Sequence, residues 1–350
     1  MIRNDIKQLA AYHVPDADGL IKLDAMENPY PLPDALRRQW AERLAQAQVN
    51  RYPDAGMHDL RAAIAEREGV KPEQVLLGNG SDEIIQMALI AADSGACVIP
   101  QPTFVMYELI SRWLKRPVAT VPLGKGFSLD AEAFLRVCAR EKAAIAFLAC
   151  PNNPTGNLWP RDTVRQIADN FRGLLVIDEA YRPFAETTHA DLISPHVIVL
   201  RTFSKLGLAG LRVGYALGCA DTIEALGKVR LPYNINSLSQ LSLAFFLEHF
   251  DVFEQQAASI RAERGRLMAA LLAMDEVEVF PSQTNFLLMR VPDADAAFEG
   301  LKARGILVKN LHGAGDVLKQ CLRVTVGLPE ENDRFIEALK EIVRETAASA

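Results

Sequence analysis

The sequence has few of the residue groupings that hold a metal ion or a disulfide framework. Its five cysteines are odd in number, widely spaced and without a CxxC pair, and its six histidines form no HxxxH pair. Disulfide frameworks belong to small secreted domains, and zinc needs closely spaced cysteine or histidine ligands. We therefore expect no metal site, no disulfides and a reducing compartment.

Long apolar runs and basic clusters are missing as well. Nowhere do about 18 apolar residues follow one another, so no membrane-spanning helix is expected. The N-terminus carries Arg3, Asp5 and Lys7 and lacks the apolar stretch of a signal peptide. With Lys+Arg 38 against Asp+Glu 44, the formal net charge is -6, which gives no electrostatic case for nucleic acid. These absences favour a cytoplasmic protein that binds neither membranes nor nucleic acid.

What the sequence does contain is the composition of a large globular protein. Its 350 residues are 49% hydrophobic and 23% charged, which suffices for one large domain with a smaller companion. Short apolar runs alternate with helical patterns, which predicts an α/β fold with a mostly parallel sheet between helices. Ser81 is expected to cap a helix over 81–92. The expected strands cover 75–77, 96–100, 143–150, 174–177, 197–201 and 211–217.

The pattern changes near residue 250. A long helical stretch over 251–274 is followed by short strands and helices, which predicts a smaller α+β domain. Strands are expected at 277–280, 286–289 and 322–326, and helices at 295–303 and from residue 331. The sequence thus predicts an N-terminal arm at 1–25, a large domain at 26–250 and a small C-terminal domain at 251–350.

The segment TFSKLGLAGLRVGY, at 202–215, carries the strongest chemical signal. Lys205 directly follows an apolar strand, Ser204 precedes it, and Arg212 lies seven residues further on. A lysine amine can form an imine with an aldehyde cofactor, and a hydroxyl and a guanidinium can hold a phosphate. The alternative, a surface lysine in a glycine-rich turn, is disfavoured because the whole segment is present.

Two further segments place polar groups at the ends of apolar strands. In LLVIDEAY, Asp178 ends a strand and Tyr181 lies three residues later. A carboxylate there can pair with a protonated pyridine nitrogen, although a structural aspartate is an equal alternative for this segment alone. In ACPNNPTG, Asn153 lies in a tight turn from which it could bond the same ring. Composition alone favours a plain turn.

A glycine-rich turn precedes the helix expected at 81–92. Free N–H groups and the dipole at a helix N-terminus attract anions, so the backbone of Gly80, Ser81 and Asp82 is a candidate phosphate cradle. The segment is only G-x-G, which makes a dinucleotide site a weak interpretation. A capped helix without a ligand explains the segment equally well.

Three other residues are candidates for contacts with a ligand. Tyr52 lies in the turn RYPDAG, and Phe104 in PTFVMY could stack on a planar ring or pack in the core. Arg323 lies within the apolar strand CLRVTVG, where a lone charge requires an anionic partner. A structural salt bridge is the alternative for Arg323.

Taken in order, these motifs resemble those of the fold-type-I pyridoxal-phosphate (PLP) aminotransferases, and among them the histidinol-phosphate aminotransferases. The matching segments include RYPD, GNGSDE, PNNPTG, DEAY, SKLGLAGLRVGY, VRLPYNINSLSQ and LRVTVG. The resemblance runs from about Ile21 to the C-terminus. It implies PLP as the cofactor, a large domain that binds it and a smaller C-terminal α+β domain.

The resemblance implies a role in cofactor binding for each matching residue. Lys205 would be the Schiff-base lysine and the proton shuttle, and Asp178 would pair with the pyridine nitrogen. Asn153 and Tyr181 would contact the ring oxygen, and Phe104 would stack on the ring. The residues implied to hold the phosphate are Ser204, Arg212, and the backbone of Gly80, Ser81 and Asp82.

The resemblance also implies a homodimer with shared active sites. Tyr52 would reach the cofactor phosphate of the neighbouring subunit, and Arg323 would bind the carboxylate or phosphate of the substrate. Lys309 stands where some relatives carry a phosphate-binding arginine, and keeps the charge without the bidentate fork. Tyr12, in the arm, would help to cover the substrate.

Two departures from the usual family pattern concern the cofactor region. The usual NENP segment reads MENP, with Met26 in place of asparagine, and Phe104 replaces a common tyrosine. Neither departure removes a group that the cofactor chemistry requires.

The expected activity is the reversible transamination of L-histidinol phosphate with 2-oxoglutarate, giving imidazole acetol phosphate and glutamate, in histidine biosynthesis. An aromatic amino-acid aminotransferase and a threonine-phosphate decarboxylase of the same superfamily are the alternatives. A PLP-binding transcriptional regulator would need a DNA-binding domain, for which there is no room before Ile21. A scaffold without catalysis is a further alternative, which replacement of Lys205 would test.

Overall fold

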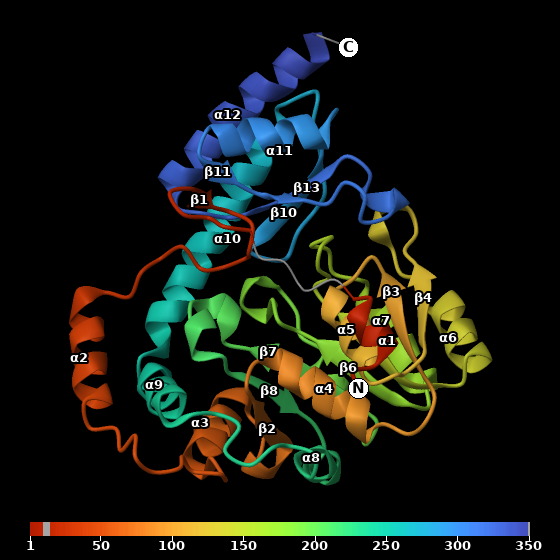
Figure 1. The fold of residues 1–350 in the computed structure, drawn as a ribbon, viewed down its shortest axis with the longest axis vertical. Coiled ribbons are helices and arrows are strands. Elements are labelled where there is room, and N and C mark those ends of the chain that lie inside the picture. Colours follow the sequence, from red (N-terminus) through yellow and green to blue (C-terminus); the bar gives the residue numbers. More distant parts are fainter. Residues whose placement is uncertain (10–14, 349–350) are drawn as a thin grey trace.

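The computed structural model describes residues 1–9 and 15–348 and is built around one seven-stranded sheet (Figure 1). The strand order is β2-β8-β7-β6-β5-β3-β4. Six of these strands follow the apolar runs of the sequence, because runs buried on both faces suit a central sheet. The strands are β2 (Val75–Gly78), β3 (Ala96–Gln101), β4 (Val118–Pro122), β5 (Ala143–Ala149), β6 (Leu174–Asp178), β7 (Val197–Thr202) and β8 (Gly214–Leu217).

The sheet is mostly parallel, which confirms the predicted α/β class. Strands β4, β3, β5, β6 and β7 pair in parallel, and β8 runs antiparallel between β7 and β2. The strand expected over 211–217 begins only at Gly214. The residues before it form a short 3₁₀ turn, η6 (Ala209–Leu211), and Arg212 has φ 54, a left-handed conformation that a strand does not contain.

Helices cover both faces of this sheet. Alternate residues of each strand point to opposite faces, so that Val176 packs in a core under α4 (Ser81–Ala91), α5 (Val105–Trp113) and α8 (Ala220–Gly227). Its neighbour Ile177 packs in the larger core under α3 (His58–Glu68), α6 (Ala131–Arg140) and α7 (Arg161–Asn170). The helix predicted from Ser81 is confirmed, but Gly80 occupies the cap position and makes no side-chain cap bond.

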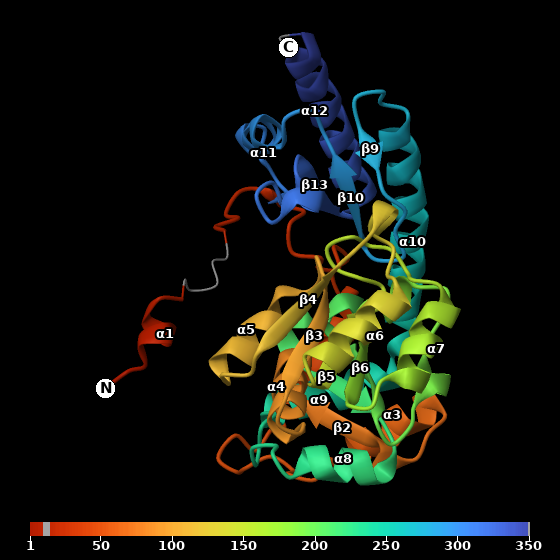
Figure 2. The same ribbon diagram turned by 90° about the vertical axis from the view of Figure 1, so that its right-hand side faces the viewer.

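The C-terminal part is built on a separate four-stranded sheet. Its order is β12-β13-β10-β9, with β9 (Glu278–Val279), β10 (Phe286–Arg290), β12 (Lys309–Asn310) and β13 (Cys321–Thr325). Helices α11 (Ala294–Ala303) and α12 (Pro329–Ala348) pack on each other beside it. Helix α10 (Phe250–Leu272) runs from the seven-stranded sheet to this part of the molecule (Figures 1 and 2). The predicted helix near 251–274 and the α+β pattern are thus confirmed.

The N-terminal segment contacts the C-terminal part of the chain. Strand β1 (Ile21–Lys22) pairs in parallel with β11 (Ile306–Leu307). The domain bounds at residues 25 and 250 remain a prediction, and this two-stranded pairing ties the end of the expected arm to the C-terminal part of the chain. The other helices are α1 (Asn4–Lys7), α2 (Asp34–Leu44) and α9 (Ser237–Glu248). In the parts of the chain that the structure describes, no helix is long and apolar enough to cross a membrane.

Candidate active site

The predicted site residues meet at the carboxyl ends of the parallel strands. A cavity of about 240 Å³ lies there, at the edge where α/β sheets bind ligands. It is reached by the ends of β5, β6 and β7 and by the start of α4. Nine predicted residues line it: Ser81, Asp82, Phe104, Asn153, Asp178, Tyr181, Ser204, Lys205 and Arg212.

Lys205 carries the amine of this cavity. It lies in a short 3₁₀ turn, η5 (Ser204–Leu206), directly after β7, and its Nζ is 5.8 Å from the centre of the Tyr181 ring. Burial, with a further contribution from the charge of Arg323, lowers the pKa of Lys205 to about 8. At pH 7 about a tenth of this amine is therefore uncharged, far more than for an ordinary lysine, and able to act as a nucleophile or a base.

Asp178 carries the carboxylate of the cavity. Its Oδ1 accepts a 2.9 Å hydrogen bond from the N–H of Ala180, and its Oδ2 accepts one of 2.6 Å from the hydroxyl of Tyr107. Burial raises the pKa of Asp178 to about 6, and the hydrogen bond from Tyr107 acts in the opposite direction. The group is thus mostly ionised at pH 7 and fixed by two donors.

Tyr107 is a site residue that the sequence analysis did not identify. It is fully buried on α5, stacks on Phe147 at 4.6 Å and meets Phe104 edge-on at 5.4 Å. The signal in the sequence is its spacing: Tyr107 stands three residues after Phe104 at the start of a helix, which puts both rings on one side.

The end of the cavity opposite the Asp178 carboxylate is suited to bind an anion. Arg212 Nη1 lies 3.5 Å from Ser204 Oγ, and Arg212 Nη2 lies 3.6 Å from Asp82 Oδ2. The N-terminus of α4 lies at this end and favours an anion. The carboxylate of Asp82, whose Oδ1 is buried without a hydrogen-bond partner among the described residues, is offset by the charge of Arg212. Gly80 favours this arrangement, because its φ of +80 suits glycine and a Cβ at its position would lie 2.6 Å from Arg212 Nη2.

Arg323 lines a second compartment, which adjoins this cavity at Asn153. Its Nη1 donates a 2.6 Å hydrogen bond to Asn153 Oδ1, and its Nη2 donates one of 2.8 Å to the carbonyl of Asp24. The second compartment, of about 390 Å³, is lined by Arg323, Asn153 and Lys309 among others. Since Oδ1 of Asn153 is engaged, its NH₂ group is the end of the side chain that can donate to a further acceptor.

One predicted site residue lies away from the others, and another is outside the part of the chain that the structure describes. Tyr52 does not line the cavity; its side chain is 80% exposed and stacks on Tyr233 with ring centres 4.4 Å apart. Tyr12 lies outside the described residues. Met26, the departure from the usual asparagine, lines both compartments with φ 54.

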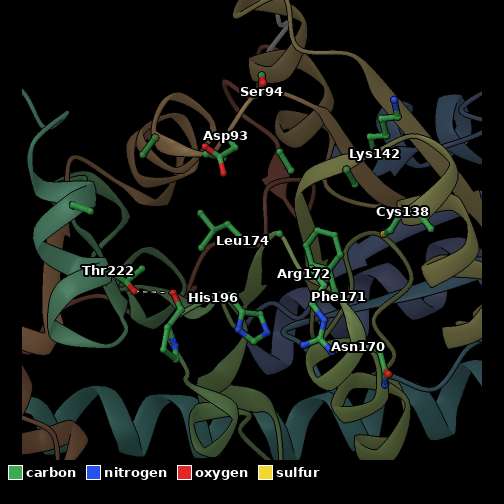
Figure 3. A pocket seen from close by; sticks show the side chains of 18 of the residues that line it. Asp93, Ser94, Cys138, Lys142, Asn170, Phe171, Arg172, Leu174, His196 and Thr222 are labelled. Carbon is green, nitrogen blue, oxygen red and sulfur yellow. Dashed lines mark hydrogen bonds between the residues drawn. The ribbon is translucent and has the colours of Figure 1, made fainter.

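A larger hollow lies elsewhere and contains none of the predicted site residues. Its volume is about 1030 Å³, and it is lined by residues that precede β5, β6 and β7, including Lys142, Arg172 and His196 (Figure 3). It therefore lies at the amino ends of the strands, away from Lys205 and Asp178. Among the residues that the structure describes, no three histidine, cysteine or acidic side chains form a group that could hold a metal ion.

Comparisons with known proteins agree with this geometry. Residues 18–339 match the family model described as aminotransferase class I and II. The chain is 48% identical to the histidinol-phosphate aminotransferase of Methylibium petroleiphilum over 98% of this chain and 94% of that protein. It is 46% identical to the enzyme of the same name from Chromobacterium violaceum over 97% of both chains.

A solved structure extends the likeness to the fold. The histidinol-phosphate aminotransferase of Sinorhizobium meliloti, in complex with pyridoxal-5'-phosphate, superposes with a TM-score of 0.88 at 25% identity over 99% of this chain and 98% of that one. This chain belongs to the class I and II aminotransferases and, within them, to the histidinol-phosphate aminotransferase family.

Proposed function

We propose that the protein transfers the amino group of L-histidinol phosphate to 2-oxoglutarate, giving imidazole acetol phosphate and glutamate, with PLP as cofactor. The observation that carries the proposal is that Lys205 and Asp178 line one cavity at the ends of β7 and β6. The names of relatives near 48% identity support the substrate, and the PLP complex of the Sinorhizobium meliloti protein supports the cofactor.

The residues of the cavity fit PLP. Bound PLP supplies an aldehyde that takes up the amino group and a protonated ring that accepts electron density. The buried carboxylate of Asp178 is suited to hold the proton on the ring nitrogen, and Tyr107 keeps that carboxylate ionised and oriented. Arg212, Ser204 and the start of α4 surround the position for the phosphate, which Gly80 leaves open.

Lys205 is proposed to move the proton in the reaction. Its lowered pKa, about 8, allows the amine to take a proton from the substrate carbon and to return it at the cofactor carbon. Asn153 and Tyr181 are suited to bond the ring oxygen. Arg323 and Lys309 line the adjoining compartment and offer positive charge for the substrate phosphate or the carboxylate of glutamate.

The proposal includes a homodimer in which Tyr52 serves the neighbouring site. It is supported by exposed apolar side chains: Tyr233, which stacks on Tyr52, is 43% exposed, and Leu231, two residues before it in the sequence, is 70% exposed. We also place the protein in the cytoplasm, in keeping with cysteines that are all free among the described residues.

The test of the activity is a coupled assay on the purified holoenzyme. Histidinol phosphate and 2-oxoglutarate should give glutamate, and Lys205→Ala should abolish turnover, whereas Lys302→Ala, on the exposed side of α11, should not change it. Phenylalanine and threonine phosphate are tested in parallel. Turnover of either one, without turnover of histidinol phosphate, would refute the proposed substrate; full activity of Lys205→Ala would refute the mechanism.

The shared site is tested by mixing two inactive subunits. Tyr52→Ala and Lys205→Ala are co-expressed with different tags. If Tyr52 serves the partner's cofactor, each mixed dimer has one intact site and one inactive site. Random pairing makes about half of the dimers mixed, so about a quarter of the wild-type activity should return. If Tyr52 serves its own subunit, no activity returns.

A further inference from the structure

A charged cavity, distinct from both compartments of the active site and from the large hollow at the amino ends of the strands, lies on the other face of the seven-stranded sheet, directly behind the PLP cavity. The side chain of Asp178 points to the face covered by α5. The next residue, Glu179, lines the charged cavity on the opposite face, together with Arg201 of β7. Its volume is about 490 Å³, and its walls are α3, α10 and the segments that follow β6 and β7. The proposed transamination uses none of its charged side chains.

The carboxylates of this cavity are already engaged. Four arginines and three glutamates line it: Arg67, Arg182, Arg201, Arg261, Glu68, Glu179 and Glu254. Glu179 accepts hydrogen bonds from Arg201, Thr188 and the N–H of His189. Glu68 accepts from Arg201 and from Tyr215, and Glu254 pairs with Arg67 at 3.0 Å.

Two arginines are left without a carboxylate. Arg182 Nη1 donates only to the carbonyl of Ala185 at 3.3 Å, and Arg261 Nη1 donates only to the carbonyl of Pro183 at 2.6 Å. Neither forms an ion pair within the described part of the chain. Each guanidinium has five N–H donors in a fork that matches carboxylate and phosphate oxygens. The cavity therefore has an excess of positive charge and free donors on two separate elements.

We propose that this cavity is a binding site for a small organic anion with two or more negative charges, carried by phosphate or carboxylate groups, held between Arg182 and Arg261. Arg261 lies on α10, and Arg182 begins the 3₁₀ turn η3 (Arg182–Phe184), so the anion bridges the two elements. Helix α10 also packs against η5, which carries Lys205. A ligand in this position would thus fasten α10 to the back of the active site.

The test is isothermal titration calorimetry of the holoenzyme with inorganic pyrophosphate, at constant ionic strength. Pyrophosphate will also bind at the substrate compartment, so two events are expected. The event at the new site should weaken at least about 10-fold in Arg182→Gln/Arg261→Gln, because two charge-assisted contacts are lost. The other event should weaken in Arg323→Gln instead. Citrate replaces pyrophosphate in a second series, to separate carboxylate from phosphate ligands.

The matched control is Arg172→Gln, an exposed arginine at the large hollow at the other end of the sheet, which should leave both events unchanged. Arg261→Gln alone, at an exposed position of α10, serves if the double variant does not fold. The proposal is overturned if both anions bind the Arg261 variants as tightly as the wild type, or if Arg323→Gln removes all binding.

Discussion

The hydroxyl of Tyr107 donates a 2.6 Å hydrogen bond to Oδ2 of Asp178, inside the core under α5. The stacking of Tyr107 on Phe147 holds the phenol in place. Burial alone would favour the neutral form of Asp178, since its pKa is raised to about 6, and the donated hydrogen bond favours the ionised form. Tyr107 is therefore a positioning residue that acts on the cofactor ring through Asp178.

Removing this hydroxyl should slow the reaction without removing the cofactor. In Tyr107→Phe, Asp178 loses a charge-assisted hydrogen bond, so its pKa rises and kcat falls about 10-fold at pH 7. The acidic limb of the pH profile of kcat/KM should move to higher pH, which a purely structural defect would not cause. Tyr233→Phe removes an exposed hydroxyl and serves as the control. An unshifted limb in Tyr107→Phe would contradict the role.

Gly80 should be needed for the affinity for PLP. An alanine Cβ at this position would lie 2.6 Å from Nη2 of Arg212, and the backbone has φ +80, so Gly80→Ala must push the guanidinium away. We expect the dissociation constant for PLP to rise about 10-fold, measured by absorbance titration of the cofactor-free protein. Gly210→Ala, where a Cβ meets nothing within 4 Å, is the control. Equal affinity in both variants would show that Arg212 does not hold the phosphate.

The sequence was sufficient to predict the meeting of Lys205 and Asp178. Asp178 ends one apolar run and Lys205 follows the next, and the carboxyl ends of parallel strands lie at one edge of a sheet. The spacing of Tyr107 from Phe104 puts both rings on one side of the helix, but the hydrogen bond of Tyr107 to Asp178 depends on how α5 packs on the sheet, which the sequence does not give. The antiparallel insertion of β8 between β2 and β7 was equally hidden, since an apolar run gives no strand direction.

The glutamate–arginine ion pairs in the cavity behind the sheet could not be predicted from the sequence for a related reason. Glu68, Glu179 and Arg201 are far apart in the sequence, and charged residues in such positions usually face solvent. Only the tertiary packing of α3 against the end of β7 brings them together.

The wrong prediction of the helix cap at Ser81 has a local cause. Serine is a common cap, but here Gly80 takes the cap position with a backbone conformation suited to glycine.

The buried amine of Lys205 should destabilise the cofactor-free protein. Its pKa is lowered from 10.5 to about 8 in the folded state, so below pH 8 the folded state carries a charge that is better solvated after unfolding. Stability should therefore rise between pH 8 and 10.5, where the unfolded chain binds more protons. At pH 7, Lys205→Met should be about 1 to 2 kcal/mol more stable than the wild type, which is less than the full pKa difference would give, because the residue as a whole is only half-buried.

Urea unfolding at pH 7 and pH 10 measures this difference. The gain of Lys205→Met should be largest at pH 7 and shrink at pH 10. Lys302→Met, at an exposed position of α11, should change stability little at either pH. A loss of stability in Lys205→Met at pH 7 would mean that the amine has a favourable partner in the folded protein.

Two helices end in the same way with different residues, which allows a matched test of backbone strain. After α5, Lys115 has φ 59, its N–H bonds the carbonyl of Arg112, and the next N–H bonds that of Ser111. After α3, Gly69 has φ 67 and makes the corresponding bonds. This left-handed position after a helix favours glycine, because a Cβ is strained there.

Lys115→Gly should therefore stabilise the protein by about 0.5 to 1 kcal/mol, and Gly69→Ala should destabilise it by a similar amount. Both changes are read from the midpoint of urea unfolding. Because Lys115 is exposed, the loss of its side chain costs little, and a destabilised Lys115→Gly would mean that the strain of this turn is relieved elsewhere.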